Sequence, residues 1–569
     1  MAFVRVACVV FFVTGLPAQP QQAASAPVTS PAQGYRIAGI VVNSLSGQPI
    51  AAASVGIGPV ANQGGAIPKA VTTGADGRFA FTGLARDKYS LMATARGFEM
   101  QFFEHHDAFA TAIAVGPDLD SEHLVFRLEP DASIEGQVTD DYNDPILNAM
   151  VRLFERRIED GLQKTSPMNQ VQTDDTGHFH IGHLAQGKYY LAVAARPWYA
   201  QNDRSVLRRR QRTSEADTRA AREAAALDVT YPLTFFPNSP DSAGASPIVL
   251  HPGERATADV IMHAVPALHL LIRTGGNPNS SASGSTLFPM GGATNPQVWQ
   301  RLFEGYLEPV FNAPVSRAQP SVVEIIGLAP GHYTIEMPSS SATNEKVVSR
   351  AWYQEIDLAG DAELNAGDAP AFATVNGSVS FPGATSVPKD ASLRISNPVS
   401  GESFSSAISD KGQVDFSADA VRPGRYNVSL DGLRGFYLSK SSATGARLIG
   451  STLEIGGENS VHVLCVAMRG IGQVDGVALR DGQPFAGAMV VLVPHDPTNN
   501  SPLFRRDQSD SDGTFTLRNV LPGQYTVVAM ANGWDLEWSN PAALQPYLKG
   551  GEAVQVPGAG KLQIKVQVQ

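Results

Sequence analysis

The sequence predicts an all-β protein, a tandem array of about five immunoglobulin-like or transthyretin-like β-sandwiches, and three observations support this. First, a hairpin pattern recurs, and each copy carries one tyrosine: Tyr89, Tyr189, Tyr333, Tyr426 and Tyr525. Second, these tyrosines lie roughly 100 residues apart except for one longer gap, and this is the size of one small sandwich. Third, 53 glycines and 39 prolines beside a charged fraction of 17% suit turn-rich β structure better than helical bundles.

The clearest copy of the hairpin pattern lies at residues 510–532. Asp512-Gly513 can supply a tight turn with positive φ, and Thr514 to Leu517 alternate like a half-buried strand. Leu521-Pro522-Gly523 turns the chain again, and Tyr525 to Met530 form an apolar returning strand. The first two copies keep both turns, whereas the third keeps only its second half. Each copy predicts a β-hairpin within one sandwich.

The chain begins with the features of a secretory signal peptide at 1–26. Arg5 supplies a short positive region, and Val6 to Leu16 form an apolar run too short to span a bilayer. A Pro- and Ala-rich linker at 27–34 follows. These features predict a secreted protein, periplasmic or extracellular at the cell surface, without a membrane span. Once the signal is removed, Cys465 is the only cysteine, so we expect a buried thiol and no intrachain disulfide.

The predicted domains follow in order along the chain. Their boundaries are 35–129, 130–263, 264–366, 371–468 and 469–569. The second carries an insertion, 203–228, whose mixed charges predict a short helix, and a Gly/Ser/Asn-rich stretch at 275–292 makes the third degenerate. Short linkers such as Leu128 to Asp131 predict a semi-rigid rod, which the irregular third domain could bend.

A family resemblance rests on motifs in a fixed order, clearest in the fifth domain. They are Gly476-Val477, Gly482 to Val490, Asp512 to Leu517 and Leu521 to Tyr525. This order resembles the carboxypeptidase regulatory-like domain, a transthyretin-like sandwich of the carbohydrate-binding-like fold that is often found in tandem in secreted bacterial proteins. The first domain matches nearly as well, the second replaces its proline turn, and the third and fourth match only in part.

The resemblance implies a fold and is nearly silent about activity. In that family the sandwich accompanies zinc peptidase domains or surface receptors and is not itself catalytic. The chain has no H-E-x-x-H, G-x-S-x-G, Walker A or strand-linked G-x-G-x-x-G motif. We therefore expect no enzyme activity, no catalytic residues and no cofactor.

The patterns of charged residues and histidines give weaker candidates for nucleic-acid and metal binding. A net charge of −11 spread along the chain argues against a nucleic-acid partner, and the run Arg208-Arg209-Arg210 is balanced by nearby acids. His178 and His180 point the same way on a strand and could hold a metal ion, but a solvent-exposed strand face is the favoured interpretation, so no metal site is predicted. The segment Gln508 to Gly513 only superficially resembles a calcium loop, and turn chemistry explains it.

The most suggestive feature is an aromatic residue nine or ten positions after each of four hairpin tyrosines. These residues, in polar loops, are Phe98, Trp198, Phe436 and Trp534. Such rings either close the end of a core or form a platform that stacks on apolar sugar faces. The candidate ligand-binding residues are Trp198, Tyr199, Trp534 and Trp538, although a structural role is the favoured interpretation of the repeat.

The sequence thus predicts a non-catalytic secreted protein of the cell envelope that binds and scaffolds. The leading ligand is a polysaccharide or another cell-envelope polymer. The first alternative is a structural stalk that positions an envelope protein partner through its sheet edges. The second alternative is an accessory or remnant of a carboxypeptidase-type envelope hydrolase.

Overall fold

The computed structural model describes most of the chain: 34–60, 69–201, 226–273, 296–303, 306–310, 315–319, 322–343, 346–365, 373–398, 401–416, 421–433, 435–456 and 460–569. The predicted signal peptide, nearly all of the linker, residues 203–225 of the insertion and the stretch 275–292 lie outside the described residues. Among the described residues, no helix has the length and apolar character needed to cross a bilayer.

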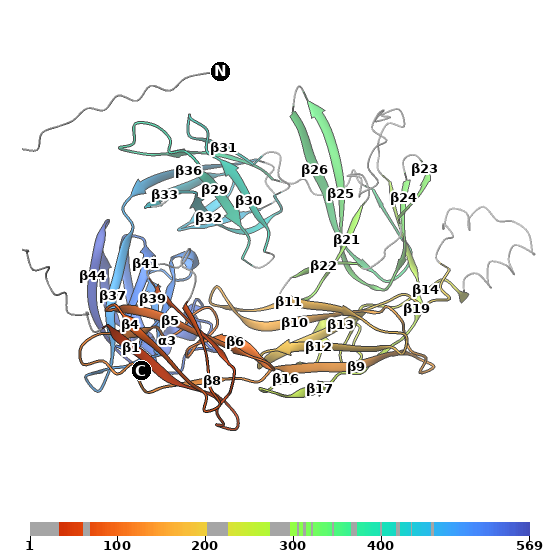
Figure 1. Cartoon of the computed structure of the whole chain (residues 1–569). Helices are drawn as coiled ribbons and strands as arrows, with labels where there is room; N and C mark the ends of the chain where they lie inside the picture. The colour runs from red at the N-terminus through yellow and green to blue at the C-terminus, as the bar shows by residue number, and fades with distance from the viewer. Residues whose placement is uncertain are drawn as a thin grey trace, which may run out of the picture.

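The regular secondary structure of the described residues is almost entirely strand, which confirms the all-β prediction. The strands form sheets that pack face to face in pairs, and each pair encloses its own apolar core (Figure 1). We number these pairs sandwich 1 to sandwich 5 along the described chain. The predicted domain boundaries remain a prediction.

Sandwich 1 and sandwich 2 come first along the chain. Sandwich 1 packs β4 (Arg78–Leu84), β1 (Tyr35–Asn43) and β8 (Leu124–Leu128) against β3 (Lys69–Thr72), β2 (Ser54–Pro59), β5 (Asp87–Ala95), β6 (Phe98–Phe102) and β7 (Ile113–Val115). Sandwich 2 packs β12 (His178–Leu184), β9 (Ala132–Asp140), β17 (Arg255–Thr257) and β18 (Val260–Met262) against β11 (Leu162–Gln172), β10 (Met150–Glu159), β13 (Gly187–Ala194), β15 (Thr234–Phe235) and β16 (Ile248–Leu250).

A ribbon of β14 (Val229–Thr230) and β19 (Val265–Pro266) precedes sandwich 3. Sandwich 3 packs β23 (Val315–Gln319), β24 (Val322–Leu328), β20 (Leu268–Arg273) and β27 (Ala362–Asn365) against β22 (Leu307–Pro309), β21 (Gln297–Arg301), β25 (Gly331–Thr343) and β26 (Lys346–Leu358). Sandwich 4 packs β31 (Gln413–Asp415), β28 (Thr374–Ser380), β36 (Ser460–Arg469) and β33 (Phe436–Thr444) against β30 (Ser403–Ala407), β29 (Ser392–Ser396), β32 (Gly424–Asp431), β35 (Thr452–Ile455) and β34 (Arg447–Ile449).

Sandwich 5 ends the chain. It packs β38 (Gln483–Pro484), β37 (Gly472–Arg480), β41 (Thr514–Val520) and β44 (Gly560–Gln567) against β40 (Arg505–Gln508), β39 (Met489–Pro494), β42 (Gly523–Met530) and β43 (Glu552–Val556). It also carries the helix α3 (Pro541–Leu548), and short 3-10 turns occur at η2 (Ser242–Gly244) and η5 (Ser501–Leu503).

All five sandwiches share one topology. The opening strand pairs antiparallel with the first strand of the hairpin and parallel with a strand near the end of the sandwich. In sandwich 1, β1 lies between β4 and β8, and in sandwich 5, β37 lies between β41 and β44. The same arrangement centres on β9, β20 and β28. The repeated hairpin in the sequence therefore corresponds to a repeated fold.

The repeated tyrosine has the same role in every sandwich. Each one is buried, and each hydroxyl donates a hydrogen bond of 2.7 to 3.1 Å to the backbone carbonyl four residues earlier. The accepting carbonyls belong to Ala85, Ala185, Ala329, Arg422 and Leu521. This contact satisfies the buried phenol and holds the turn against the core, as tyrosine corners do in other sandwiches.

The turn glycine of the hairpin is also structural. Gly77 has a φ of 71° and Gly513 a φ of 75°, a conformation that side chains with a Cβ rarely adopt. A Cβ on Gly77 would lie 2.6 Å from the carbonyl oxygen of Val41 in the opening strand. The predicted positive φ at these turns is therefore confirmed. Cys465 is buried as predicted, and burial raises the pKa of its thiol.

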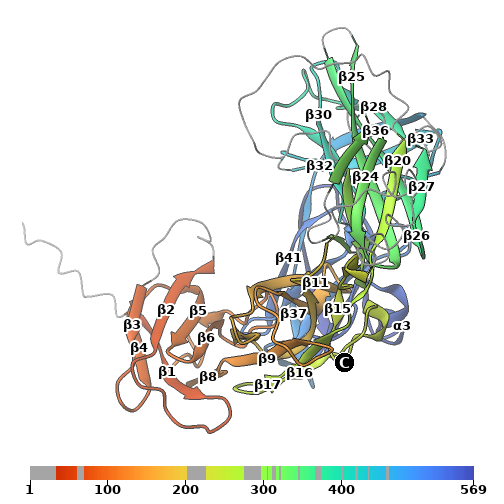
Figure 2. The same cartoon turned by 90° about the vertical axis from the view of Figure 1, so that its right-hand side faces the viewer.

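The five sandwiches form a closed ring, which differs from the semi-rigid rod expected from the short linkers. In Figure 1 the chain runs from sandwich 1 along sandwich 2, through sandwiches 3 and 4, and returns so that sandwich 5 lies beside sandwich 1. Figure 2 shows sandwich 5 passing behind the strands of sandwich 2. Linker length constrains only neighbouring sandwiches, whereas the ring closes through contacts between residues about 400 positions apart.

Candidate functional site

The four aromatic residues that follow the hairpin tyrosines have different surroundings. Trp198 is 90% exposed. Trp534 packs into an apolar cluster of sandwich 5, and Phe98 packs against the core of sandwich 1. Phe436 lies edge-on to Phe381, with ring centroids 5.8 Å apart. The shared sequence position thus holds a packed ring in three sandwiches and an exposed ring in sandwich 2.

Trp534 and Trp538 pack into the cluster of helix α3, and Trp534 also contacts sandwich 1. Their cluster includes Leu544, which is fully buried in the helix. The imidazole of His106 stacks on Trp534 with ring centroids 4.1 Å apart and planes 8° apart. The guanidinium carbon of Arg506 lies 5.4 Å from the Trp534 ring and 5.5 Å from the Trp538 ring. The face of Trp534 toward sandwich 1 is therefore not free for a ligand.

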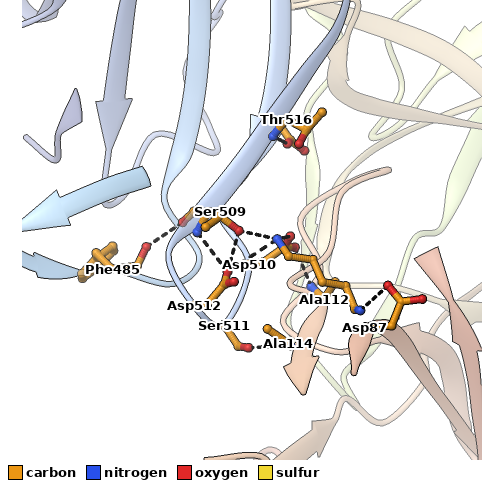
Figure 3. Close-up of polar contacts among 12 residues, drawn as sticks. Asp87, Ala112, Ala114, Phe485, Ser509, Asp510, Ser511, Asp512 and Thr516 are labelled. Carbon is orange, nitrogen blue, oxygen red and sulfur yellow. Dashed lines mark hydrogen bonds and ion pairs between the residues drawn. The ribbon is translucent and has the colours of Figure 1, made fainter. Parts of the chain in front are cut away.

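The contact between sandwich 1 and sandwich 5, here called the closing contact, centres on an ion pair. Lys88 of β5 donates to the carboxylate of Asp510 and to the hydroxyl of Thr514, and its Nζ lies 3.5 Å from Asp512. The amide of Ala112 donates to Asp510 Oδ1 over 3.0 Å (Figure 3). The side chains of Lys88 and Asp510 are only 30% and 18% exposed, so their attraction is less screened than that of a surface pair.

The backbone of the same turn runs beside strand β7. The amide of Ser511 donates to the carbonyl of Ala112 over 3.0 Å, and the amide of Ala114 donates to Ser511 Oγ over 2.9 Å (Figure 3). These bonds satisfy backbone groups on the edge of a short strand that pairs only with β5 among the described strands. The turn between β40 and β41 therefore covers a sheet edge of sandwich 1.

Gln508 is almost fully buried in the closing contact, with 2% exposure. Its side-chain amide donates to the Glu104 carbonyl over 2.7 Å and to Thr111 Oγ1 over 2.8 Å. Its Oε1 lies 3.2 Å from His106 Nδ1. Burial lowers the pKa of His106, so the neutral imidazole that stacks on tryptophan is favoured here. The side-chain amide of Gln508 thus forms hydrogen bonds with the loop 104–111 of sandwich 1.

A second ion pair crosses the closing contact with the opposite polarity. Arg506 of sandwich 5 lies 3.2 Å from the carboxylate of Asp107 of sandwich 1. Its guanidinium carbon also sits 4.3 Å from the ring centre of Phe109. Burial lowers the pKa of Arg506, and the hydrogen bond and charge of Asp107 oppose that change. Each side of the contact therefore contributes both a cation and an anion.

Sandwich 2 also touches sandwich 5, at the turn that joins β10 and β11. Ser539 donates its amide to the Gly161 carbonyl over 3.0 Å and its hydroxyl to the Asp160 carbonyl over 2.9 Å. The amide of Gln163 donates to the carboxylate of Glu537 over 3.1 Å. The loop that carries Trp534 is thus held from two sides, by sandwich 1 and by sandwich 2.

Burial raises the pKa of two acids of sandwich 5, Asp507 and Asp510. Burial raises the pKa of Asp507 to about 6, with Asp510 adding to the shift and hydrogen bonds from backbone amides and the charge of Lys88 opposing it. Burial also raises the pKa of Asp510, again against the charge of Lys88. In the segment Gln508 to Gly513, whose spacing superficially resembles a calcium loop, the carboxylates of Asp510 and Asp512 lie beside Lys88 of sandwich 1.

The second candidate site is an aromatic cluster on sandwich 2, here called the platform: the exposed Tyr142 and Trp198 and the half-buried Tyr199. The rings of Trp198 and Tyr199 are 5.7 Å apart and meet edge to face at 87°. Tyr142, in the loop after β9, is 83% exposed. Burial raises the pKa of Tyr199, and the charges of Asp140, Tyr142 and Asp141 raise it further, which places these groups near its phenol. The platform thus combines exposed rings with carboxylates.

A groove of about 580 Å³ lies on the outer face of sandwich 2, over β9, β12 and β17. His178 and His180 line it together with acidic and amide side chains, while the intervening Phe179 is buried in the core. Nδ1 of His180 lies 3.8 Å from the carboxylate of Glu135. Within the described residues, no group of three or more His, Cys, Asp or Glu side chains is arranged to hold a metal ion.

Comparison with known families supports part of this description. Residues 36–116 match the model of the carboxypeptidase regulatory-like domain. This segment covers most of sandwich 1 and confirms the resemblance for that part of the chain. The matched family is described as regulatory-like, and no catalytic family is indicated. A search of curated proteins found no match.

Solved structures with some likeness include three pilins. The minor pilin GBS52 of Streptococcus agalactiae is 12% identical, and the match covers 41% of this chain and 97% of that one with a TM-score of 0.22. BcpA, the major pilin subunit of Bacillus cereus, is 11% identical, with coverages of 60% and 99% and a TM-score of 0.14. The shaft pilin SpaA of Lactobacillus rhamnosus GG is 9% identical, with coverages of 41% and 98% and a TM-score of 0.18.

Sequence reasoning did not find the residues of the closing contact. Lys88 precedes a hairpin tyrosine, and Lys188 occupies the same position in sandwich 2, so the lysine alone carries no signal. The turn from Gln508 to Asp512 is rich in polar residues, but turns usually are. A partly buried charge pair between distant domains has no local pattern, and only the folded chain shows it.

Proposed function

We propose that this protein is a secreted, non-catalytic envelope scaffold that binds a polysaccharide at the platform of sandwich 2. The observation that carries the proposal is the exposure of Trp198, because a large apolar ring that stands free in solvent next to a second aromatic is unusual for a structural residue. The domain boundaries predicted from the sequence are part of the proposal, with one sandwich in each domain.

The chemistry of the platform suits a sugar. The rings of Trp198 and Tyr142 can cover the apolar face of a pyranose, and the nearby carboxylate of Asp141 can accept hydrogen bonds from its hydroxyls. Asp140 is buried, and its Oδ1 accepts the backbone amides of Tyr142 and Asp144. Asp141 pairs with His263 but keeps 43% of its side chain exposed, so it is the acid that we expect to contact the ligand. Trp534 and Trp538 are not part of this proposal, because both pack into the α3 cluster and His106 of sandwich 1 stacks on Trp534.

Titration of the signal-free protein with soluble oligosaccharides tests the proposal. The panel includes fragments of peptidoglycan, chitin, cellulose and xylan, and the readouts are tryptophan emission and isothermal titration calorimetry. We expect a saturable signal with one oligosaccharide class, and we expect Trp198→Ala to weaken binding at least tenfold because it removes the stacking ring. The Met100→Ala variant, which truncates an exposed apolar residue of sandwich 1, is the matched control and should bind like the wild type.

Binding that survives Trp198→Ala would move the ligand site away from the platform. If no oligosaccharide in the panel binds, the structural alternative, in which the sandwiches act only as a scaffold, becomes the better account.

A further inference from the structure

The closing contact joins two unlike surfaces of one chain. Sandwich 1 contributes Lys88 and Asp107, and sandwich 5 contributes Asp510 and Arg506. In the closed chain each cation meets an anion of the other surface: Lys88 meets Asp510, and Arg506 meets Asp107. Such a contact is heterologous, and heterologous contacts can form within one chain or between copies.

The contact is largely polar. Apart from the stacking of His106 on Trp534 and the ring contacts of Arg506, its described interactions are hydrogen bonds and ion pairs. Interdomain contacts of this polar kind resemble transient protein–protein interfaces, which open and close. Lys88 and Asp510 are 422 residues apart, so no short linker keeps the two surfaces together when the contact opens.

Sandwiches 1 and 2 are firmly joined to each other. The amide of Asp131 donates to the Gly97 carbonyl over 3.1 Å, and the amide of Gly253 donates to the Pro130 carbonyl over 2.9 Å. An opening that keeps these bonds moves sandwiches 1 and 2 as one unit, and it also breaks the hydrogen bonds that Ser539 and Glu537 of sandwich 5 form with the β10–β11 turn of sandwich 2. It exposes both the Lys88 surface and the complementary turn of sandwich 5 on the same molecule.

We propose that the closing contact also forms between two copies of this chain, with sandwich 1 of one copy docked on the β40–β41 turn of the other. Joining the two surfaces in one chain gives the intramolecular contact an effective concentration, and copies compete when their local concentration approaches it, as on a crowded cell surface. Two opened chains that dock reciprocally form a closed dimer, and one-sided docking forms a linear array.

Two variants with complementary charges test this. Lys88→Glu places a carboxylate against Asp510 and Asp512, and Asp510→Lys places an ammonium against Lys88, so each variant disrupts its own contact. In an equimolar mixture, opposite charges meet again in both contacts of a reciprocal dimer. The mass is measured by size-exclusion chromatography with light scattering over a concentration series. A mixture of Lys565→Glu and Asp76→Lys, both at exposed positions, is the matched control.

We expect the mixture to contain at least tenfold more dimer than either variant alone at the same total concentration, and we expect added salt to reduce it. The proposal is wrong if the mixture stays monomeric while both variants keep the circular dichroism spectrum of the folded protein. It is equally wrong if the control mixture dimerises to the same extent.

A disulfide clamp gives a second test if either charge reversal unfolds a sandwich. Ala114→Cys with Ser511→Cys places two thiols across the closing contact, where the native groups are hydrogen-bonded. Oxidation in dilute solution locks the closed chain. After concentration, the reduced clamp variant should form dimers and the oxidised one should not. Equal dimer content in the two states would overturn the proposal.

Discussion

Two loops of this protein occupy the same position in the repeat and have opposite surroundings. The loop 195–201 carries Trp198, and the loop 531–540 carries Trp534, each nine residues after a hairpin tyrosine. Trp198 is exposed beside Tyr199, whereas Trp534 packs against helix α3 and stacks on His106 of sandwich 1. The sandwich beneath each loop is the same in topology, so the difference comes from what covers the loop.

The comparison shows that a repeated aromatic can have two roles in one chain. Where another element of the fold supplies cover, the ring becomes part of a core or of a contact between sandwiches. Where no described element covers it, the ring is available to a ligand. Position in the repeat therefore predicts that an aromatic is present, and its surroundings decide its role.

The largest expected effect is that of Trp534→Ala. The substitution removes a ring from the α3 cluster, the stack on His106 and the cation–π contact with Arg506. We expect sandwich 5 to lose about 3 kcal/mol of stability. Hydrogen exchange of the β42 amides measures this loss as reduced protection. Unchanged protection would show that Trp534 contributes no more to stability than the exposed Trp198. The proposed difference between the two loops would then be wrong.

The next effect concerns pH. Asp507 has a folded pKa of about 6, above its ordinary value of about 3.9, so the folded state holds a proton that the unfolded state has already lost. This contribution to stability is present below about pH 4 and is lost as pH rises through about 6. We expect Asp507→Asn to remove this pH dependence and to stabilise sandwich 5 at pH 7.5 by about 2 kcal/mol.

Urea unfolding of the wild type and Asp507→Asn at pH 4, 5, 6 and 7.5 measures this difference. Asp76→Asn, at an exposed turn of sandwich 1, is the control and should leave the pH profile unchanged. The free energy of unfolding of wild-type sandwich 5 should fall between pH 4 and pH 6. If it rises over this range, and rises equally in Asp507→Asn, the pKa of Asp507 is not raised.

A smaller effect is expected for the ion pair that holds sandwich 1 over the covered loop. A double-mutant cycle with Lys88→Met and Asp510→Asn should give a coupling of about 1 kcal/mol, because both side chains are partly buried. Faster exchange of the Ala112 and Ala114 amides and stronger acrylamide quenching of Trp534 should accompany each single change. Additive effects would show that Lys88 and Asp510 do not act as a pair.

The smallest effect on stability is expected for Trp198→Ala. An exposed side chain contributes little to folding, so we expect a change within about 0.5 kcal/mol. The same variant should lose the most red-shifted and most easily quenched part of the tryptophan emission. A loss of stability similar to that of Trp534→Ala would mean that Trp198 is also covered in solution and would remove the platform from consideration.

Much of the fold followed from local patterns in the sequence. The acidic turn with glycine, the alternating strand and the buried tyrosine each act over a few residues, so their meaning does not depend on distant parts of the chain. The five tyrosines make the same buried hydrogen bond, and the turn glycines have the predicted positive φ. Even sandwich 3, the most degenerate in sequence, keeps this contact at Tyr333.

The candidate sites were less predictable. The loop aromatics were found from their spacing, but spacing could not separate Trp198 from Trp534, because exposure depends on α3 and on sandwich 1. The closing contact was missed entirely, and the rod expected from short linkers is instead a ring. Lys88 and Asp510 are ordinary residues of a strand and a turn, and nothing near either one identifies the other.

By itself the sequence determined the all-β class, the repeated hairpin and the buried tyrosine of each sandwich, because these features follow from short-range sterics and from the alternation of apolar residues. The tertiary structure alone decided which surfaces meet, which tryptophan is covered and which acids become buried. The cover over Trp534 comes from helix α3 and from sandwich 1. The closing of the ring depends on contacts between residues about 400 positions apart, and such contacts exist only once the sandwiches have folded.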